Sequence, residues 1–124
     1  MIERYSRKEL KAIWEDYNKY SIWLDIELAA AEAMEKLKII PRGVVKKVKS
    51  KSKINVKRIL DIENKVKHDV IAFLTSVTEK VGKEARYLHK GMTSSDVIDT
   101  CFNLQLKQSG KILLKDIDEL LRSI

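Results

Sequence analysis

Little in this 124-residue sequence can interrupt or cross-link regular structure. It has one proline, four glycines and one cysteine, and only 6% of its residues are aromatic. The single cysteine, Cys101, cannot form an internal disulfide, which excludes a disulfide-stabilised scaffold and favours a reducing compartment. Because Cys101 stands in an apolar periodic stretch, we expect it to be a small buried hydrophobic residue.

Signals for export, membrane insertion and metal binding are missing as well. The charged start "MIERYSRKEL" has no continuous apolar run behind it, so we expect neither a signal peptide nor a transmembrane segment. No CxxC, HExxH or GxxxxGK[ST] motif occurs. We therefore expect a cytoplasmic protein with no metal, no cofactor and no P-loop nucleotide site.

The composition is that of a soluble amphipathic protein. Hydrophobic residues make up 44% of the sequence and charged residues 35%, which argues against disorder. The length suits one compact unit or a piece of a larger one. A net charge of +7 could attract nucleic acid, an anionic membrane or a negatively charged metabolite, and composition alone does not choose among them.

Apolar residues recur at helical spacing along the sequence, and no alternating segment is long enough for a strand. Ser6 and Glu9 have the spacing of a capping box, which predicts the first helix start. The helical pattern continues to Leu37 and should stop before Pro41. We predict an all-α fold.

The middle of the chain predicts three further helical segments. Residues 44–53, "VVKKVKSKSK", read as a short exposed helix or turn. Asn55 is placed to cap a helix that runs to about Val66. Residues 70–81 carry an apolar face, and Gly82 is placed as the C-terminal cap.

The last helix should begin near Ser95 and run to the end of the sequence. Its apolar face is formed by Leu113, Ile117, Leu120, Leu121 and Ile124. Because no Gly, Asn or Pro terminates this pattern, we expect the helix to continue in further protein.

Arg4 and Tyr5, ahead of the first helix, form the first of three polar spots. A guanidinium offers a planar fork of donors that suits phosphate, and the phenol adds a hydroxyl donor and a stacking face. The alternative is an ordinary pair of surface residues.

Lys67, His68 and Asp69 form the second spot, at a junction between two helices. Asp69 suits the start of the following helix, so the three residues can be a helix cap with a solvated histidine. The other interpretation is that lysine, histidine and helix N-terminus bind an anion together.

The third spot is "HKGMTSSDVIDT", residues 89–100. Gly91 permits a tight turn, and Thr93, Ser94 and Ser95 place hydroxyls and free backbone N–H groups at a helix start. Such a start can be a simple N-cap or a cradle for a carboxylate or phosphate.

The basic run from Lys46 to Arg58 supports an alternative function. It has no interleaved aromatic residues on which bases could stack, so a solvated face is the simpler interpretation. The alternatives to an enzyme are a small basic helical module that binds nucleic acid or an acidic partner, and a domain that serves only association.

Taken together, these segments resemble a known family. "ERYS", "KHDVIAFLTSV" and "YLHKGMTSSDVIDT", with "YSIWLDIELAAAEAMEKLKIIP" between them, are similar in order and spacing to the N-terminal region of the adenylosuccinate lyases of the fumarase/aspartase superfamily. The resemblance spans essentially the whole chain. It implies an N-terminal helical domain over residues 1–92 and the start of a long central-bundle helix over residues 93–124.

The resemblance also implies an activity. Adenylosuccinate lyases eliminate fumarate from adenylosuccinate, giving AMP, and from succinylaminoimidazole-carboxamide ribotide in purine biosynthesis. A base removes a proton next to a carboxylate, and an acid protonates the departing nitrogen. An anionic succinyl-nucleotide substrate and a homotetramer are implied, with no nucleic-acid or membrane partner.

Site residues carry over by position. Arg4 and Tyr5 match a pair that holds the phosphate end of the nucleotide, and Thr93 and Ser94 match a hydroxyl pair that contacts the substrate. His89 lies close to that pair, and we expect it to support the site without contacting the substrate.

The central triplet also matches substrate-contacting positions, and the chain departs from the family elsewhere. Lys67, His68 and Asp69 match the triplet, and His68 is expected to assist near the reacting end. The family's proton donor lies in a segment similar to "T-x-G-R-T-H" and its base in "SSxMPxKxN", and neither occurs here. We therefore expect an N-terminal part of a lyase that lacks the general acid and base and is inactive alone.

Overall fold

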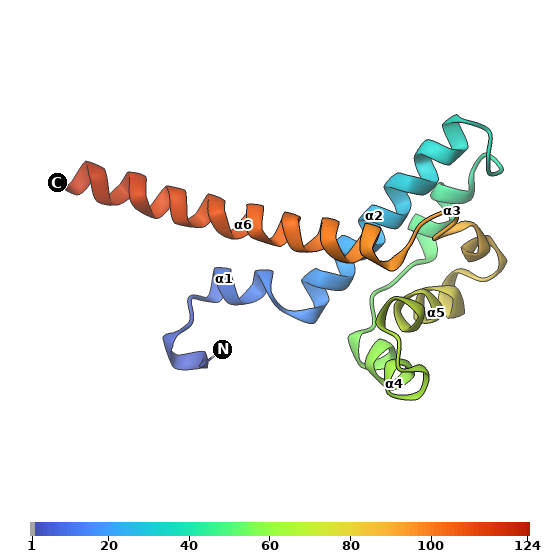
Figure 1. Ribbon diagram of the computed structural model, residues 1–124, viewed down its shortest axis with the longest axis horizontal. Coiled ribbons are helices and arrows are strands. Elements are labelled where there is room, and N and C mark those ends of the chain that lie inside the picture. The colour runs from blue at the N-terminus through green and yellow to red at the C-terminus, as the bar shows by residue number, and fades with distance from the viewer. Residues whose placement is uncertain (1) are drawn as a thin grey trace.

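The computed structural model describes residues 2–124, and all regular structure among them is helical (Figure 1). In chain order the elements are the 3-10 helix η1 (Glu3–Tyr5), α1 (Lys8–Ile13), α2 (Asp16–Lys36), α3 (Val44–Lys51), α4 (Val56–Val66), α5 (Asp69–Val81), the 3-10 helix η2 (Lys83–Tyr87) and α6 (Ser94–Ser123). The predicted all-α fold is confirmed.

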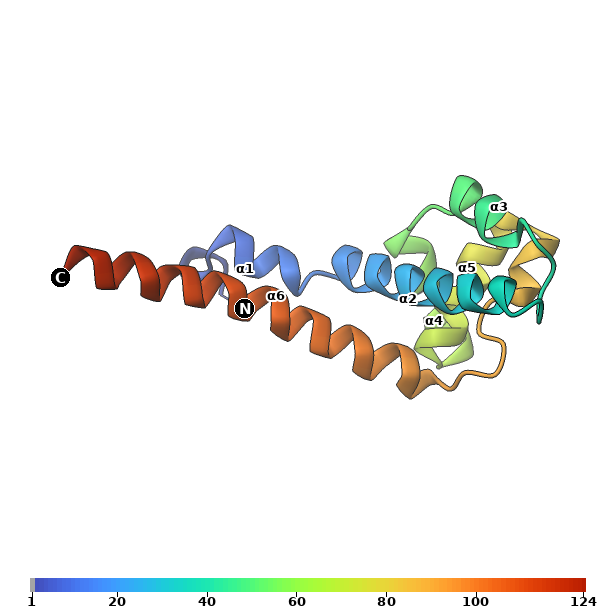
Figure 2. The same ribbon diagram turned by 90° about the horizontal axis from the view of Figure 1, so that it is seen from above.

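Helix α6 runs along the longest axis of the molecule, with α2 beside its first half and α1 beside its middle (Figures 1 and 2). Helices α1 and α2 pack against it, and α3, α4, α5 and η2 gather beside α2. The last turns of α6 extend away from this group, and the large apolar side chains there are exposed. The fold is therefore a small helical domain with one projecting helix.

Three buried aromatic rings anchor α5 to α2. Tyr20 and Phe73 have no exposed surface, and Trp23 is 3% exposed. Trp23 meets Phe73 edge to face with ring centroids 5.5 Å apart, and Tyr20 stacks on Phe73 at 6.0 Å. Such pairs add to the apolar area that each ring buries. The aromatic cluster thus fixes the start of α5, where Lys67, His68 and Asp69 lie.

Several predicted helix ends are confirmed. The Asn55 side chain accepts a hydrogen bond from the Arg58 N–H at 3.0 Å at the start of α4. Gly82 follows α5 with φ of 83° and donates its N–H to Thr78. Helix α6 begins at Ser94, one residue from the predicted start.

The short basic helix and the cysteine are also where the sequence placed them. Helix α3 forms over the predicted stretch, although Val44 and Val48 on it are buried, so only its other face is exposed. Cys101 is 2% exposed, as expected for a small hydrophobic residue.

The predicted capping box at Ser6 and Glu9 is wrong. The Ser6 hydroxyl donates to the Ile2 carbonyl at 2.7 Å, and the Glu9 carboxylate accepts from Arg7. Helix α1 begins at Lys8 with no side-chain cap. The reason is the 3-10 turn η1, which places the serine hydroxyl over the preceding turn and so removes it from the helix start.

Helix α2 ends before Pro41 as predicted, but at Lys36. Lys38 takes a left-handed φ of 61°, and the Ile39 N–H donates to the Met34 carbonyl at 2.9 Å. The left-handed residue reverses the chain and satisfies a terminal carbonyl, so the helix stops without the proline.

Candidate functional site

Arg4 and Tyr5 lie in η1 and are exposed. The Arg4 guanidinium carbon sits 4.8 Å from the centroid of the Tyr5 ring, and 74% of Tyr5 is exposed. An ion pair of 2.8 Å between Lys11 and Glu3 ties η1 to α1, and Arg7 pairs with Asp116 of α6. The Arg4 side chain makes no hydrogen bond or ion pair within residues 2–124, so its donors are available to a ligand.

The second spot joins α4 to α5 in a tight turn. Lys67 takes a left-handed φ of 55°, and its N–H donates to the Glu63 carbonyl at 2.8 Å. The turn is short because this one residue ends α4 and the next already caps α5.

His68 caps α5, and Asp69 is the first residue of that helix, as the sequence indicated. His68 Nδ1 accepts a hydrogen bond from the Ile71 N–H at 3.4 Å. Asp69 Oδ1 accepts from the Val70 N–H at 2.7 Å and lies 3.6 Å from His68 Nδ1. With Nδ1 used as an acceptor, the neutral ring carries its proton on Nε2. The half-exposed imidazole can therefore offer an N–H to a ligand.

Thr93 and Ser94 stand at the start of α6. Thr93 is the N-cap, and its N–H donates to Asp96 Oδ2 at 2.8 Å, so Asp96 serves the helix start. Gly91 has φ of 73°, the turn conformation that the sequence predicted. The Ser94 hydroxyl makes no hydrogen bond within the described residues, so it and the free N–H groups of the first turn can bind an anion.

A hydrogen-bonded pair beside this loop, between the buried Glu27 and His89, was missed by the sequence prediction. Glu27 of α2 has no exposed surface, and its carboxylate receives the His89 N–H and lies 2.6 Å from His89 Nδ1. Glu27 is four residues from Trp23 and four from Ala31, both buried. A carboxylate on an apolar helix face needs a hydrogen-bond partner. The four-residue spacing of Glu27 from two apolar residues was therefore the sequence signal for a buried, paired carboxylate.

Within residues 2–124, the first spot lies far from the second. Figures 1 and 2 place η1 beside α1 and the middle of α6, far along the long axis from the α4–α5 junction. No hydrogen bond or ion pair among residues 2–124 joins one spot to another. Each spot therefore offers its own set of donors, without a direct link to the other two.

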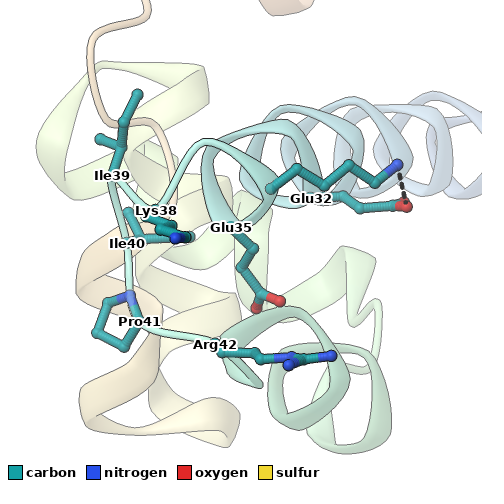
Figure 3. Close-up of a pocket in the computed structure, with 8 residues that line it drawn as sticks. Glu32, Glu35, Lys38, Ile39, Ile40, Pro41 and Arg42 are labelled. Carbon is teal, nitrogen blue, oxygen red and sulfur yellow. Dashed lines mark ion pairs between the residues drawn. The ribbon is translucent and has the colours of Figure 1, made fainter.

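One surface hollow lies away from all three spots, at the end of α2 (Figure 3). It is lined by Glu32, Glu35, Lys36, Lys38, Ile39, Ile40, Pro41 and Arg42. Its carboxylates are already engaged, because Glu32 pairs with Lys36 at 2.9 Å and Glu35 accepts from the Val45 N–H. We assign the hollow no role in the site.

Two properties of the described residues bear on other functions. None of the helices within residues 2–124 is long and apolar enough to cross a membrane. No group of three His, Cys, Asp or Glu side chains there could hold a metal ion. In the basic run, Lys47 and Arg58 are paired with Glu84 and Glu79, so part of its charge is neutralised.

The match to a family model decides the family. A model described as "Lyase" matches residues 3–124. This chain belongs to the lyase family. The lyase chain is 46% identical over 118 residues to adenylosuccinate lyase of Bacillus subtilis strain 168, covering 95% of the chain and 27% of that relative. It is 48% identical over 124 residues to adenylosuccinate lyase of Synechocystis, covering all of the chain and 29% of the relative.

A solved structure shows the same fold. Fumarate lyase from Mesorhizobium sp. BNC1 superimposes on the lyase chain with a TM-score of 0.83 at 21% identity, covering 91% of the chain and 27% of that protein. The resemblance read from the sequence is therefore confirmed in both sequence and fold. The lyase chain spans less than a third of the length of these relatives.

Proposed function

We propose that the lyase chain supplies the N-terminal part of an adenylosuccinate lyase. The observation that supports this proposal is the identity of 46–48% to relatives of that name over 95–100% of the chain. The reaction would be elimination of fumarate from adenylosuccinate, giving AMP, and from succinylaminoimidazole-carboxamide ribotide. No observation favours the alternative of a nucleic-acid-binding module.

The proposed role of the three spots is to bind the two anionic ends of the substrate. Arg4 and Tyr5 would hold the phosphate end, because the guanidinium fork is unengaged and matches phosphate geometry. Thr93 and Ser94 would bind the succinyl end through hydroxyls and free backbone N–H groups at the start of α6. Donors in fixed positions suit an elimination in which negative charge develops on the carboxylate.

Lys67, His68 and Asp69 would contact the substrate between these ends. Lys67 supplies positive charge, and the cap bond to Ile71 holds the His68 ring with Nε2–H outward. Asp69, beside the ring, would keep it oriented. His68 would assist charge balance near the reacting nitrogen, whereas the general acid and base are expected outside this chain.

The assembly that we propose is a homotetramer built on α6. Its second half exposes five large apolar side chains, 52–66% of each being accessible: Leu113, Leu114, Ile117, Leu120 and Leu121. An apolar face of this length on one helix favours burial against other helices. In such an assembly residues 1–92 would form the outer helical domain and 93–124 the start of the central bundle, in a cytoplasmic protein. Several subunits together would bring the three spots to one site.

A chimera tests the proposed site. The lyase chain would replace the matching 118-residue segment of Bacillus subtilis adenylosuccinate lyase, and fumarate release would be followed as absorbance loss on adding adenylosuccinate. Arg4→Ala should lower kcat/KM by roughly 10- to 100-fold, as expected when a hydrogen-bonded charge contact is lost. Lys49→Ala, an exposed cation of the basic run, is the matched control and should change it less than about twofold. Equal effects of both substitutions would contradict the proposed role of Arg4.

A further inference from the structure

Glu27 is the one acidic side chain among residues 2–124 that the fold buries completely, with an exposed fraction of 0%. It lies on the apolar face of α2, between the buried Trp23 and Ala31. Removing an ionised carboxylate from water is strongly unfavourable unless hydrogen bonds replace the lost solvent. The buried Glu27 carboxylate therefore needs hydrogen-bond partners inside the fold.

Both oxygens of this carboxylate are used by a single residue. His89 donates its backbone N–H to Oε2 at 2.6 Å, and its Nδ1 lies 2.6 Å from Oε1. The contacts join residues 62 positions apart, so α2 directly holds the loop before α6. His89 also takes a left-handed φ of 58°, a conformation that persists in a non-glycine residue only where its surroundings impose it.

The bond to Glu27 determines which ring nitrogen carries a proton. An ionised carboxylate only accepts hydrogen bonds, so the nitrogen that faces it must be Nδ1–H. The other nitrogen, Nε2, has no hydrogen-bond partner among residues 2–124, and 22% of the His89 side chain is exposed. His89 lies four residues before Thr93, in the loop that leads into α6.

We propose that Glu27 is a positioning residue, which holds the His89 ring with Nδ1 protonated and leaves Nε2 free for an anionic group of the substrate. In the neutral ring Nε2 accepts, and in the protonated ring Nε2–H donates to an anionic oxygen while Glu27 balances the charge. The ligand assignment rests on the proposed function. The ring geometry does not, because it follows from the contacts between Glu27 and His89 alone.

The chain contains two histidines, and the structure gives them opposite tautomers. His68 uses Nδ1 as an acceptor from the Ile71 N–H, whereas His89 uses Nδ1 as a donor to Glu27. Long-range proton–nitrogen NMR spectra of the chain labelled with ¹⁵N-histidine distinguish the two. We expect the protonated nitrogen of neutral His68 to be Nε2, and Nδ1 of His89 to remain protonated. An Nε2–H tautomer for neutral His89 would overturn the proposal without any variant.

The substitution Glu27→Gln tests whether Glu27 determines the tautomer of His89. The amide can accept from the His89 N–H and donate to Nδ1, so the proton should move to Nε2 in the neutral ring. Glu35→Gln is the matched control, because Glu35 also lies on α2 (Figure 3). Its carboxylate also accepts a backbone N–H, that of Val45 at 2.6 Å. The control should leave the His89 tautomer unchanged. A ring that keeps Nδ1–H in Glu27→Gln would contradict the assignment.

The two substitutions in the chimera test the ligand assignment. Glu27→Gln should lower kcat/KM about tenfold or more, the effect of losing one hydrogen bond to a charged group, while Glu35→Gln leaves it near the chimera's own value. An active chimera that tolerates Glu27→Gln would refute the role of His89 toward substrate. An inactive chimera with the predicted tautomers would refute the proposed function and leave the positioning by Glu27 intact.

Discussion

Phe73→Ala should destabilise the lyase chain more than any surface substitution. Phe73 has no exposed surface and makes ring contacts with Tyr20 and Trp23. Loss of its buried area costs about 1.5–3 kcal/mol, and two aromatic pairs add roughly 0.5–1.5 kcal/mol each. The sum agrees with the about 3–5 kcal/mol measured for phenylalanine truncation in cores. A chain of 124 residues has a total stability of roughly 6–19 kcal/mol, so much of it would be lost.

The other phenylalanine of the chain provides the control. Phe102 on α6 is 50% exposed and contacts Trp14 with centroids 6.1 Å apart, so Phe102→Ala should cost about 1 kcal/mol or less. Urea unfolding followed by helical circular dichroism measures both, at several protein concentrations so that association through α6 is separated from folding. Equal losses for the two variants would refute the aromatic anchor of α5.

Three further predictions concern helix ends, acid stability and the cysteine. Asn55→Ala should cost about 0.5–2 kcal/mol in urea unfolding, because the Arg58 N–H loses its cap, and no change would contradict the cap. Hydrogen bonds from Arg58 lower the pKa of the Glu79 carboxyl below its ordinary value of 4.5; the pair therefore stabilises fully above that value and less as pH falls through the lowered pKa. Glu79→Gln should reduce the loss of stability at acidic pH, measured as urea unfolding midpoints across pH. An unchanged pH profile would contradict the stabilising role of the Arg58–Glu79 pair. Burial raises the pKa of the Cys101 thiol, so iodoacetamide should label the native chain far more slowly than the urea-unfolded chain; equal rates would show an exposed thiol.

Local signals in the sequence were sufficient for most of the helices. Asn55 and Gly82 act within one turn of their own position, so a short window contains their full physical cause. Ser6 also had the right neighbour at Glu9, yet the 3-10 turn before it bound the hydroxyl first. Competition between two local hydrogen bonds cannot be resolved from spacing alone.

The candidate site was predictable as residue types and not as an arrangement. Arg4, His68 and Thr93 were identified from their segments, but the sequence did not show that the helices place Arg4 far from His68. The Glu27–His89 pair was missed because its two members stand 62 positions apart. Only packing of α2 beside the loop before α6 brings that carboxylate to the imidazole.

Fumarate release by the chimera with Bacillus subtilis adenylosuccinate lyase tests the central proposal most directly. The chimera should assemble as the parent enzyme does and release fumarate from adenylosuccinate, while the 124-residue chain alone, assayed under the same conditions, should release none. A correctly assembled chimera without activity would contradict the proposal that these helices supply the substrate-binding part of the site. Turnover by the chain alone would contradict the expectation that the general acid and base lie outside it.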